Sequence, residues 1–357
     1  MEGTVFYKRL DAYRFIAVSF VMVSHWLNFL KAYVNIGEVG VILFFVLSGF
    51  LITNSLLTAL QQQPDKRKIA IVFYVRRFLR IFPLYYLVIV LFYVVFKDAV
   101  LKKDIAYYLF YGVNLLVLKL QHWPDHFSHF WSLSVEEQFY VCWPIIIIPF
   151  FTVRSTLIKL ILIAALLSFY LLLTFKKYNN EFFLMNSFYS SLAIVAGAFL
   201  SWCWNFRKVW LLKMRLISTF PVMLGLLSVL FFFRQSQYFY LLFLLLSIGN
   251  GILLILYLIG NENGERLYVD SFWTNKGIGY LGKISYGIYV YHNFMYHLFA
   301  MAGFDRNALT DWSSKGYVIF FIVYPFFYFV VTIIISVLSW ELFERPINNL
   351  KRYFPYR

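Results

Sequence analysis

Charged residues and cysteines are scarce in this sequence. Only 14% of the 357 residues are charged, whereas a soluble domain carries about 25%. No stretch is both long and polar enough to fold in water by itself, so the composition excludes an attached soluble catalytic domain. The two cysteines, Cys142 and Cys203, lie in apolar stretches without CxxC or Cys/His spacing. They predict neither a disulfide framework nor a cysteine metal site.

Apolar residues are abundant: 62% of the chain is hydrophobic and 22% is aromatic. A membrane-spanning helix needs about 20 mostly apolar residues. The sequence therefore predicts an all-α polytopic membrane protein, a bundle of about ten transmembrane helices that forms a single integral-membrane domain over 1–357. The segment 105–118 is apolar but short, which predicts a re-entrant or interfacial helix. The expected spans lie near 10–30, 37–60, 82–99, 135–153, 156–175, 187–204, 216–233, 238–258, 278–302 and 316–340.

The charge is strongly positive, with 32 Lys and Arg against 17 Asp and Glu. These cations lie in short runs between apolar segments, so the positive-inside rule explains them better than nucleic-acid binding does. With ten crossings and a cytoplasmic N-terminus, the inner loops carry 20 Lys and Arg and the outer loops 10, with two more inside spans. We therefore expect both termini in the cytoplasm. The first span contains charged residues and lacks a small-residue cleavage site, so it is predicted to be retained rather than removed as a signal peptide.

Arg14 and His25 are ionisable residues inside the first expected span. They are 11 residues apart, which on a helix is about three turns and about 16 Å along one face. Taken singly, Arg14 could reach the inner headgroups and His25 could hydrogen-bond a neighbouring helix. Together they place a cationic anchor near one side and a potential general base toward the other.

Small and polar residues interrupt two other spans. Ser48 and Gly49 would allow another helix or a ligand to approach closely, and helix packing is the simpler interpretation. Ser285, Tyr289 and His292 share a face at spacings of four and three residues. Hydrogen bonds between helices would explain Ser285 and Tyr289 without a function.

Three arginines, Arg76, Arg77 and Arg80, precede the third expected span. They could form a basic interfacial helix held by anionic lipid. Alternatively they could bind the phosphates of a nucleotide-like cofactor, because arginine recognises phosphate with two parallel hydrogen bonds. Pro83 is expected in the first turn of a new helix.

The fourth span begins with Ser134, Glu136 and Glu137. Ser134 and Glu137 have the spacing of a capping box, whereas Glu136 is not needed for one. Nearby loop histidines have no carboxylate at a fixed spacing, so we expect no metal site. These histidines are His122, His126 and His129.

Six segments in this order together resemble the membrane acyltransferase-3 family, bacterial enzymes that O-acylate surface glycans. The resemblance extends from residue 10 to 346, nearly the whole chain. The matching segments are LDAYRFIAVSFVMVSHW, FFVLSGFLI, RRFLRIFPLYY, WSLSVEEQFYVCWP, LGKISYGIYVYH and ERP.

The resemblance implies transfer of an acyl group, usually acetyl, from cytoplasmic acyl-CoA to a hydroxyl at the outer face of the bacterial inner membrane. The acceptor would be a surface polysaccharide, lipopolysaccharide, peptidoglycan or related glycan. Membrane lipid would be a partner and nucleic acid would not. Many family members carry an extracytoplasmic SGNH domain. Because this sequence ends about ten residues after the ERP motif, we expect that a second transfer step would need a separate protein.

Catalysis is expected from His25 and Arg14, with Glu136 or Glu137 holding the histidine or the sugar. The expected CoA-binding residues are Arg76, Arg77 and Arg80. Residues expected to support the substrate or the structure are Asp11, Ser48, Gly49, Ser134, Ser285, Tyr289 and His292.

Two other classes fit the composition. A transporter or flippase of lipid-linked glycans would also place arginine and histidine inside a basic bundle, but it would not consume acyl-CoA. A membrane scaffold for polysaccharide assembly would tolerate the loss of both Arg14 and His25.

Overall fold

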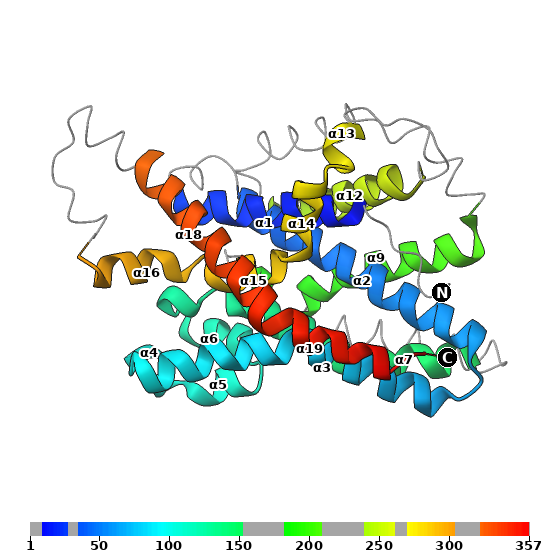
Figure 1. Ribbon diagram of the computed structural model, residues 1–357. Helices are drawn as coiled ribbons and strands as arrows, with labels where there is room; N and C mark the ends of the chain where they lie inside the picture. The colour runs from blue at the N-terminus through cyan, green and yellow to red at the C-terminus, as the bar shows by residue number, and fades with distance from the viewer. Residues whose placement is uncertain are drawn as a thin grey trace.

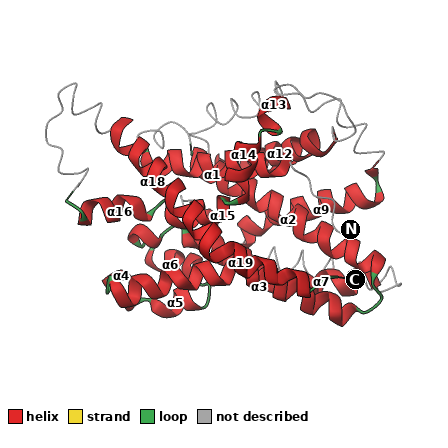
Figure 2. Cartoon of the chain, in the orientation of Figure 1, coloured by secondary structure: helices red, strands yellow, loops and turns green. Residues whose placement is uncertain are grey.

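The computed structural model describes residues 9–27, 35–152, 182–208, 239–260, 270–303 and 322–356, which contain helices and no strand (Figure 2). The expected spans at 156–175 and 216–233 lie outside these residues. Cys142 and Cys203 are both free, as expected.

Four described helices are long and apolar enough to cross a membrane, which confirms a helical membrane protein. Because part of the chain is not described, the number ten stays a prediction. The four are α2 (Ile36–Gln62), α3 (Lys66–Val90) with its π-helical continuation η2 (Leu91–Val95), α7 (Phe130–Thr152), and α18 (Tyr324–Ser339) with η8 (Trp340–Glu344), α19 (Arg345–Asn349) and η9 (Leu350–Tyr353).

Helix α2 lies at the centre of the bundle and packs against α1 (Arg9–Trp26), α9 (Ser187–Phe206) and α12 (Phe239–Gly260), as Figure 1 shows. Two glycines bring α2 and α9 together. A Cβ on Gly49 would lie 1.8 Å from the carbonyl oxygen of Ile194, and a Cβ on Gly197 would lie 1.9 Å from that of Val46. Gly49 therefore serves close helix packing, the simpler of its two interpretations.

Helix α1 is held near both of its ends. Near its start, the backbone of Asp11 contacts α14 (Lys276–Lys283) so closely that a Cβ on Gly282 would lie 1.7 Å from the Asp11 carbonyl oxygen. At its end, Trp26 Nε1 donates a hydrogen bond to the His292 carbonyl oxygen at 3.2 Å. These contacts fix the positions of Arg14 and His25.

The span expected at 278–302 is not one continuous helix, so this prediction is wrong. The segment consists of α14, α15 (Ser285–Tyr291) and α16 (Phe294–Met301). The second break follows His292, where the side chain of Asn293 donates a hydrogen bond to the backbone carbonyl of His126 at 2.8 Å. A side chain bound to another segment's backbone fixes this turn between α15 and α16.

The segment 105–118 forms two short helices, α5 (Ile105–Leu109) and α6 (Val113–Leu120). Between them, Tyr111 has a left-handed backbone with φ of 51°. Neither helix is long enough to cross a bilayer. With α4 (Ala99–Lys103) they gather at one end of the bundle, at the lower left of Figure 1.

The expectation about Pro83 is wrong. Pro83 does not begin a new helix but lies inside α3, which starts at Lys66. A membrane helix tolerates proline because neighbouring helices compensate for the lost hydrogen bond. In the ERP motif, Pro346 occupies the first turn of α19, where its missing N–H costs little, so the helical segment that begins at Tyr324 continues past it.

Candidate functional site

A cavity of about 130 Å³ lies between α1, α2, α3, α7 and α15. Its walls combine apolar side chains with a dense set of polar ones. The polar lining residues are Arg14, Ser48, Arg77, Arg80, Ser132, Glu136, Tyr140, Ser285, Tyr286 and Tyr289. Residues from five separate segments of the sequence therefore converge, including seven of the expected site residues.

The three cavity arginines differ in their partners. Arg14 forms an ion pair with the buried Asp11 one turn earlier. Arg80 donates a hydrogen bond to the Lys283 carbonyl oxygen at 3.1 Å, and Arg77 lies 5.2 Å from the centre of the Tyr140 ring. Within the described residues neither Arg77 nor Arg80 forms an ion pair. Both guanidinium groups line the cavity, where arginine could bind an anionic group.

Glu136 faces the cavity and is held by two hydroxyls. Ser48 Oγ donates to its Oε1 at 2.8 Å, and Tyr140 OH donates to its Oε2 at 3.2 Å. Among the described residues a hydrogen-bond partner of His25 is His292. Glu137 is buried outside the cavity lining, and its Oε1 has no hydrogen-bond partner among the described residues.

His25 and His292 form a hydrogen-bonded pair about 16 Å along α1 from the Arg14 level. Nδ1 of His25 lies 2.7 Å from Nε2 of His292. The rings are parallel within 3°, with centres 4.9 Å apart. Because the rings are parallel and two of their nitrogens are 2.7 Å apart, the ring planes are at most 2.7 Å apart. This separation is too small for one ring to lie over the face of the other, so the rings meet edge to edge.

The hydrogen bonds of this pair fix where its protons lie. Nδ1 of His292 is 2.6 Å from the Tyr289 carbonyl oxygen, which can only accept, so this Nδ1 carries a proton. Nε2 of neutral His292 then accepts a hydrogen bond from Nδ1 of His25. Neutral His25 consequently has its lone pair on Nε2, the form that a general base or nucleophile requires.

Tyr289 connects the cavity to the histidine pair. Tyr289 lines the cavity; its hydroxyl lies 2.5 Å from Ser132 Oγ and donates to the His129 carbonyl oxygen at 3.0 Å. Its own carbonyl oxygen orients His292. The shared face expected for Ser285, Tyr289 and His292 is thus divided, because the first two line the cavity and the third contacts His25.

The structure places Arg76 and Ser134 away from the cavity. Arg76 Nη1 donates to the carbonyl oxygens of Lys351 and Phe354 at 3.1 and 3.0 Å, so it anchors the C-terminal segment. The predicted capping box is wrong because α7 begins at Phe130. Ser134 therefore lies within the helix, where its hydroxyl donates to the Phe130 carbonyl oxygen at 3.0 Å.

The loop histidines do not converge on one point. His122 is exposed, His126 pairs with Asp98, and His129 Nε2 contacts the Val290 carbonyl oxygen at 3.0 Å. Sequence analysis also missed Ser132, Tyr140 and Tyr286 in the cavity. Tyr140 lies one turn after Glu136, and this i, i+4 spacing was the signal that could have identified it.

Comparison with known proteins identifies the family of this chain. A family described as an acyltransferase domain matches residues 7–341. The peptidoglycan O-acetyltransferase OatA of Listeria monocytogenes is 28% identical over 82% of this chain and 50% of its own length. A Staphylococcus aureus protein named "Putative O-acetyltransferase SACOL0978" is 28% identical over 95% of this chain and 57% of its own.

A Bacillus subtilis protein named "Putative peptidoglycan O-acetyltransferase YrhL" is 36% identical over 44% of this chain and 26% of its own length. The chain spans about half the length of the first two relatives. No solved structure matches it. Since the family match covers nearly all of the sequence, the chain belongs to the acyltransferase-3 family expected from its six motifs.

Proposed function

We propose that this protein transfers an acyl group, acetyl in the simplest case, from acyl-CoA on one side of the membrane to a hydroxyl of a surface glycan on the other. One observation carries the proposal: Arg14 and His25 lie on a single helix, α1. Arg14 lines the arginine-lined cavity, and His25 pairs with His292 about three turns further along. Anion binding and proton transfer are thus separated along the helix axis.

The arginine cavity is the proposed donor site. Arg77 and Arg80 suit the phosphates of CoA, which would stay at the cavity mouth. The volume of about 130 Å³ is slightly smaller than a cavity of about 150 Å³ that holds benzene. It therefore suits the acyl thioester and the end of its arm, but not a nucleotide. Glu136 could accept a hydrogen bond from an amide N–H of that arm.

His25 is the proposed general base. Its Nε2 would take the proton of the acceptor hydroxyl while the hydroxyl oxygen bonds to the thioester carbonyl carbon. The carbon–sulfur bond then breaks, and the leaving thiolate takes the proton from His25. The same Nε2 could instead carry the acyl group between donor and acceptor, as a covalent intermediate.

Arg14 is proposed to orient the donor. At about 16 Å from the His25 level, it cannot contact the carbonyl oxygen of a thioester that is reacting beside His25. Its ion pair with Asp11 fixes the guanidinium at the cavity wall. The thioester would therefore extend from the arginines toward His25 before the transfer.

The inner membrane of a bacterium is the proposed location, with the arginine side and both termini in the cytoplasm. The names of the relatives support O-acetylation, and two of them name peptidoglycan as the acceptor. Peptidoglycan or another surface glycan, lipopolysaccharide included, is accordingly the proposed acceptor class.

The test is incubation of the purified protein with radiolabelled acetyl-CoA and a mixed extract of bacterial surface glycans, beside the His25→Ala variant. The proposal predicts label on a glycan with wild type and none above background with the variant, whose folding is checked by its thermal unfolding. Unchanged labelling by His25→Ala would refute the role of His25. If the folded wild type consumed neither acetyl-CoA nor succinyl-CoA, a glycan flippase would be the better account.

A further inference from the structure

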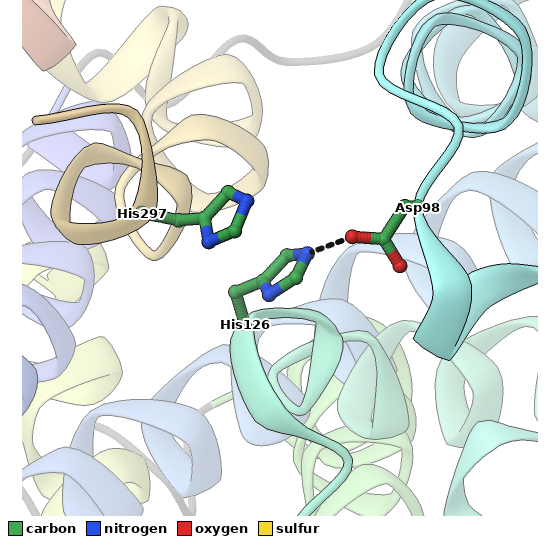
Figure 3. A group of neighbouring side chains, drawn as sticks. All are labelled: Asp98, His126 and His297. Atoms are coloured by element: carbon green, nitrogen blue, oxygen red, sulfur yellow. Dashed lines mark ion pairs between the residues drawn. The ribbon is translucent and has the colours of Figure 1, made fainter. Parts of the chain in front are cut away.

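Asp98, His126 and His297 converge at the end of the bundle where α4 and α16 lie (Figure 3). They come from three distant parts of the sequence: the turn between η2 and α4, the 3-10 helix η3 (Asp125–Phe127), and α16. One potential ligand atom from each residue lies within 4.8 Å of the other two. Asp98 lies shortly after the membrane-spanning segment Lys66–Val95. None of the three residues lines the arginine cavity.

This cluster contains one more imidazole than an ion pair between Asp98 and His126 requires. His126 Nε2 lies 3.0 Å from Asp98 Oδ2, and one imidazole would suffice for that pair. The His297 ring nevertheless stacks on the His126 ring, with centres 4.2 Å apart and planes inclined by 14°. Two protonated imidazoles at this separation would repel each other. Two neutral ones beside a carboxylate provide the donor set of a transition-metal site.

The carboxylate of Asp98 is already oriented for such a ligand. Its Oδ1 accepts a hydrogen bond from the Leu101 N–H at 2.8 Å and so caps α4. This bond leaves Oδ2 to contact His126. Metal ligands are commonly held in this way by a hydrogen bond to their second polar atom. The His126 segment is fixed in turn by the hydrogen bond from Asn293 to its backbone carbonyl.

We propose that Asp98, His126 and His297 form a binding site for a divalent transition metal ion such as Zn²⁺. Two histidines and one carboxylate are a common zinc ligand set, with a fourth position left for water or another ligand. Zinc bonds of about 2.0–2.2 Å place ligand atoms about 3.3 Å apart. The pair of Asp98 and His126 already meets this spacing at 3.0 Å. The ligand atom of His297, which lies within 4.8 Å of the other two, would have to move closer to complete it.

A bound ion would fasten three segments together at this end of the bundle. It would link the turn after η2, which holds Asp98, to η3 and α16. This site is closer to the pair of His25 and His292 than to the cavity arginines. The connection is direct: Phe294 packs on both His126 and His129, and His129 packs on His292. This proposal is independent of the acyl transfer proposed above.

Zinc content of the purified full-length protein tests the proposal. The protein is stripped with a chelator, dialysed against Zn²⁺ and analysed by mass spectrometry of the metal. Wild type should retain about one zinc per chain, and Zn²⁺ should raise its unfolding temperature. His297→Gln and Asp98→Asn should bind zinc at least about tenfold more weakly. The asparagine keeps an acceptor for the cap of α4, so this variant separates metal binding from folding.

Two further variants serve as controls. His122→Gln, in the same loop but exposed, should bind zinc like wild type. His292→Gln should also do so, because His292 belongs to the other histidine cluster. Zinc retention unchanged in both Asp98→Asn and His297→Gln would overturn the proposal. So would loss of zinc in His292→Gln alone, or a folded wild type that retains none.

Discussion

Arg76 and Arg77 are adjacent in the sequence but have different surroundings. Arg77 lines the cavity, whereas Arg76 binds backbone carbonyls of the C-terminal segment. A hydrogen bond to a charged group contributes about 1.5–3 kcal/mol, or roughly a tenfold to hundredfold change in binding. We expect Arg77→Gln to raise the KM for acetyl-CoA about tenfold or more, with a smaller effect on kcat.

Arg76→Gln is the matched control for this prediction. It should lower the unfolding temperature by loosening the C-terminal segment and leave the KM for acetyl-CoA nearly unchanged. Steady-state kinetics and thermal unfolding of both variants distinguish the two roles. Equal KM values for the two variants would contradict a donor-binding role specific to Arg77.

His292 is predicted to act as a positioning residue for His25. Its Nε2 accepts the hydrogen bond that keeps the lone pair of His25 on the catalytic nitrogen. His292→Leu removes this acceptor, and losing the correct tautomer in a serine-protease triad costs about 10⁴-fold in kcat. We expect a loss of at least about 10²-fold here.

His292→Gln supplies a carbonyl oxygen at about the same place. It should restore part of the activity lost in His292→Leu, because an amide oxygen can accept the same hydrogen bond. Single-turnover rates and unfolding temperatures of the two variants provide the comparison. Equal rates in the two folded variants would indicate that His292 serves packing alone.

Some site residues could be predicted from helical spacing and others could not. Arg14 and His25 were identified because their spacing on one helix defines a common face. The pairing of His25 with His292 could not be predicted, since 267 residues separate them. Ser134 was misinterpreted because a capping box is a local pattern, whereas the start of α7 at Phe130 depends on its packing in the folded protein.

The close packing of helices α2 and α9 depends on one glycine in each helix. Gly49→Ala or Gly197→Ala would place a Cβ within 2 Å of a backbone carbonyl of the partner helix, as the separations of 1.8 and 1.9 Å show. Overpacking of this kind costs about 1–3 kcal/mol. We expect each variant to unfold at a lower temperature in detergent.

Gly249→Ala in α12 is the matched control, because nothing lies within 4 Å of the Cβ it would add. It should be neutral or slightly stabilising, since alanine favours a helix over glycine by up to about 1 kcal/mol. The packing account would fail if Gly49→Ala and Gly197→Ala were as stable as Gly249→Ala.

Hydropathy predicted the existence of helices better than their boundaries. It identified α2, α7, α9 and α12, because burial in lipid demands long apolar runs. It could not locate the turn at Asn293, which depends on a contact with His126 from another part of the chain. Nor could it show that α3 continues through Pro83, because neighbouring helices decide whether a proline is tolerated.

Membrane topology provides a prediction for the whole molecule. Since α5 and α6 are too short to cross, Lys102 and His122, which flank them, should lie on the same side. Cysteines placed at these exposed positions, in a background with Cys142 and Cys203 replaced by serine, should react alike with a membrane-impermeant thiol reagent. Labelling from opposite sides would show that the segment crosses.

Transfer across the bilayer is the central claim for the whole molecule. The arginine end of the bundle also holds the C-terminal segment, through Arg76. A tag at the C-terminus therefore reports which protein molecules in sealed vesicles have their donor side outward. Acceptor glycan is enclosed in these vesicles, and radiolabelled acetyl-CoA is added only outside.

Labelling of the enclosed glycan is the measurement that tests this claim most directly. We predict label on the enclosed glycan in proportion to the outward-facing tag, and none above background in vesicles containing His25→Ala. Label that formed only when donor and acceptor were on the same side of the membrane would contradict the account.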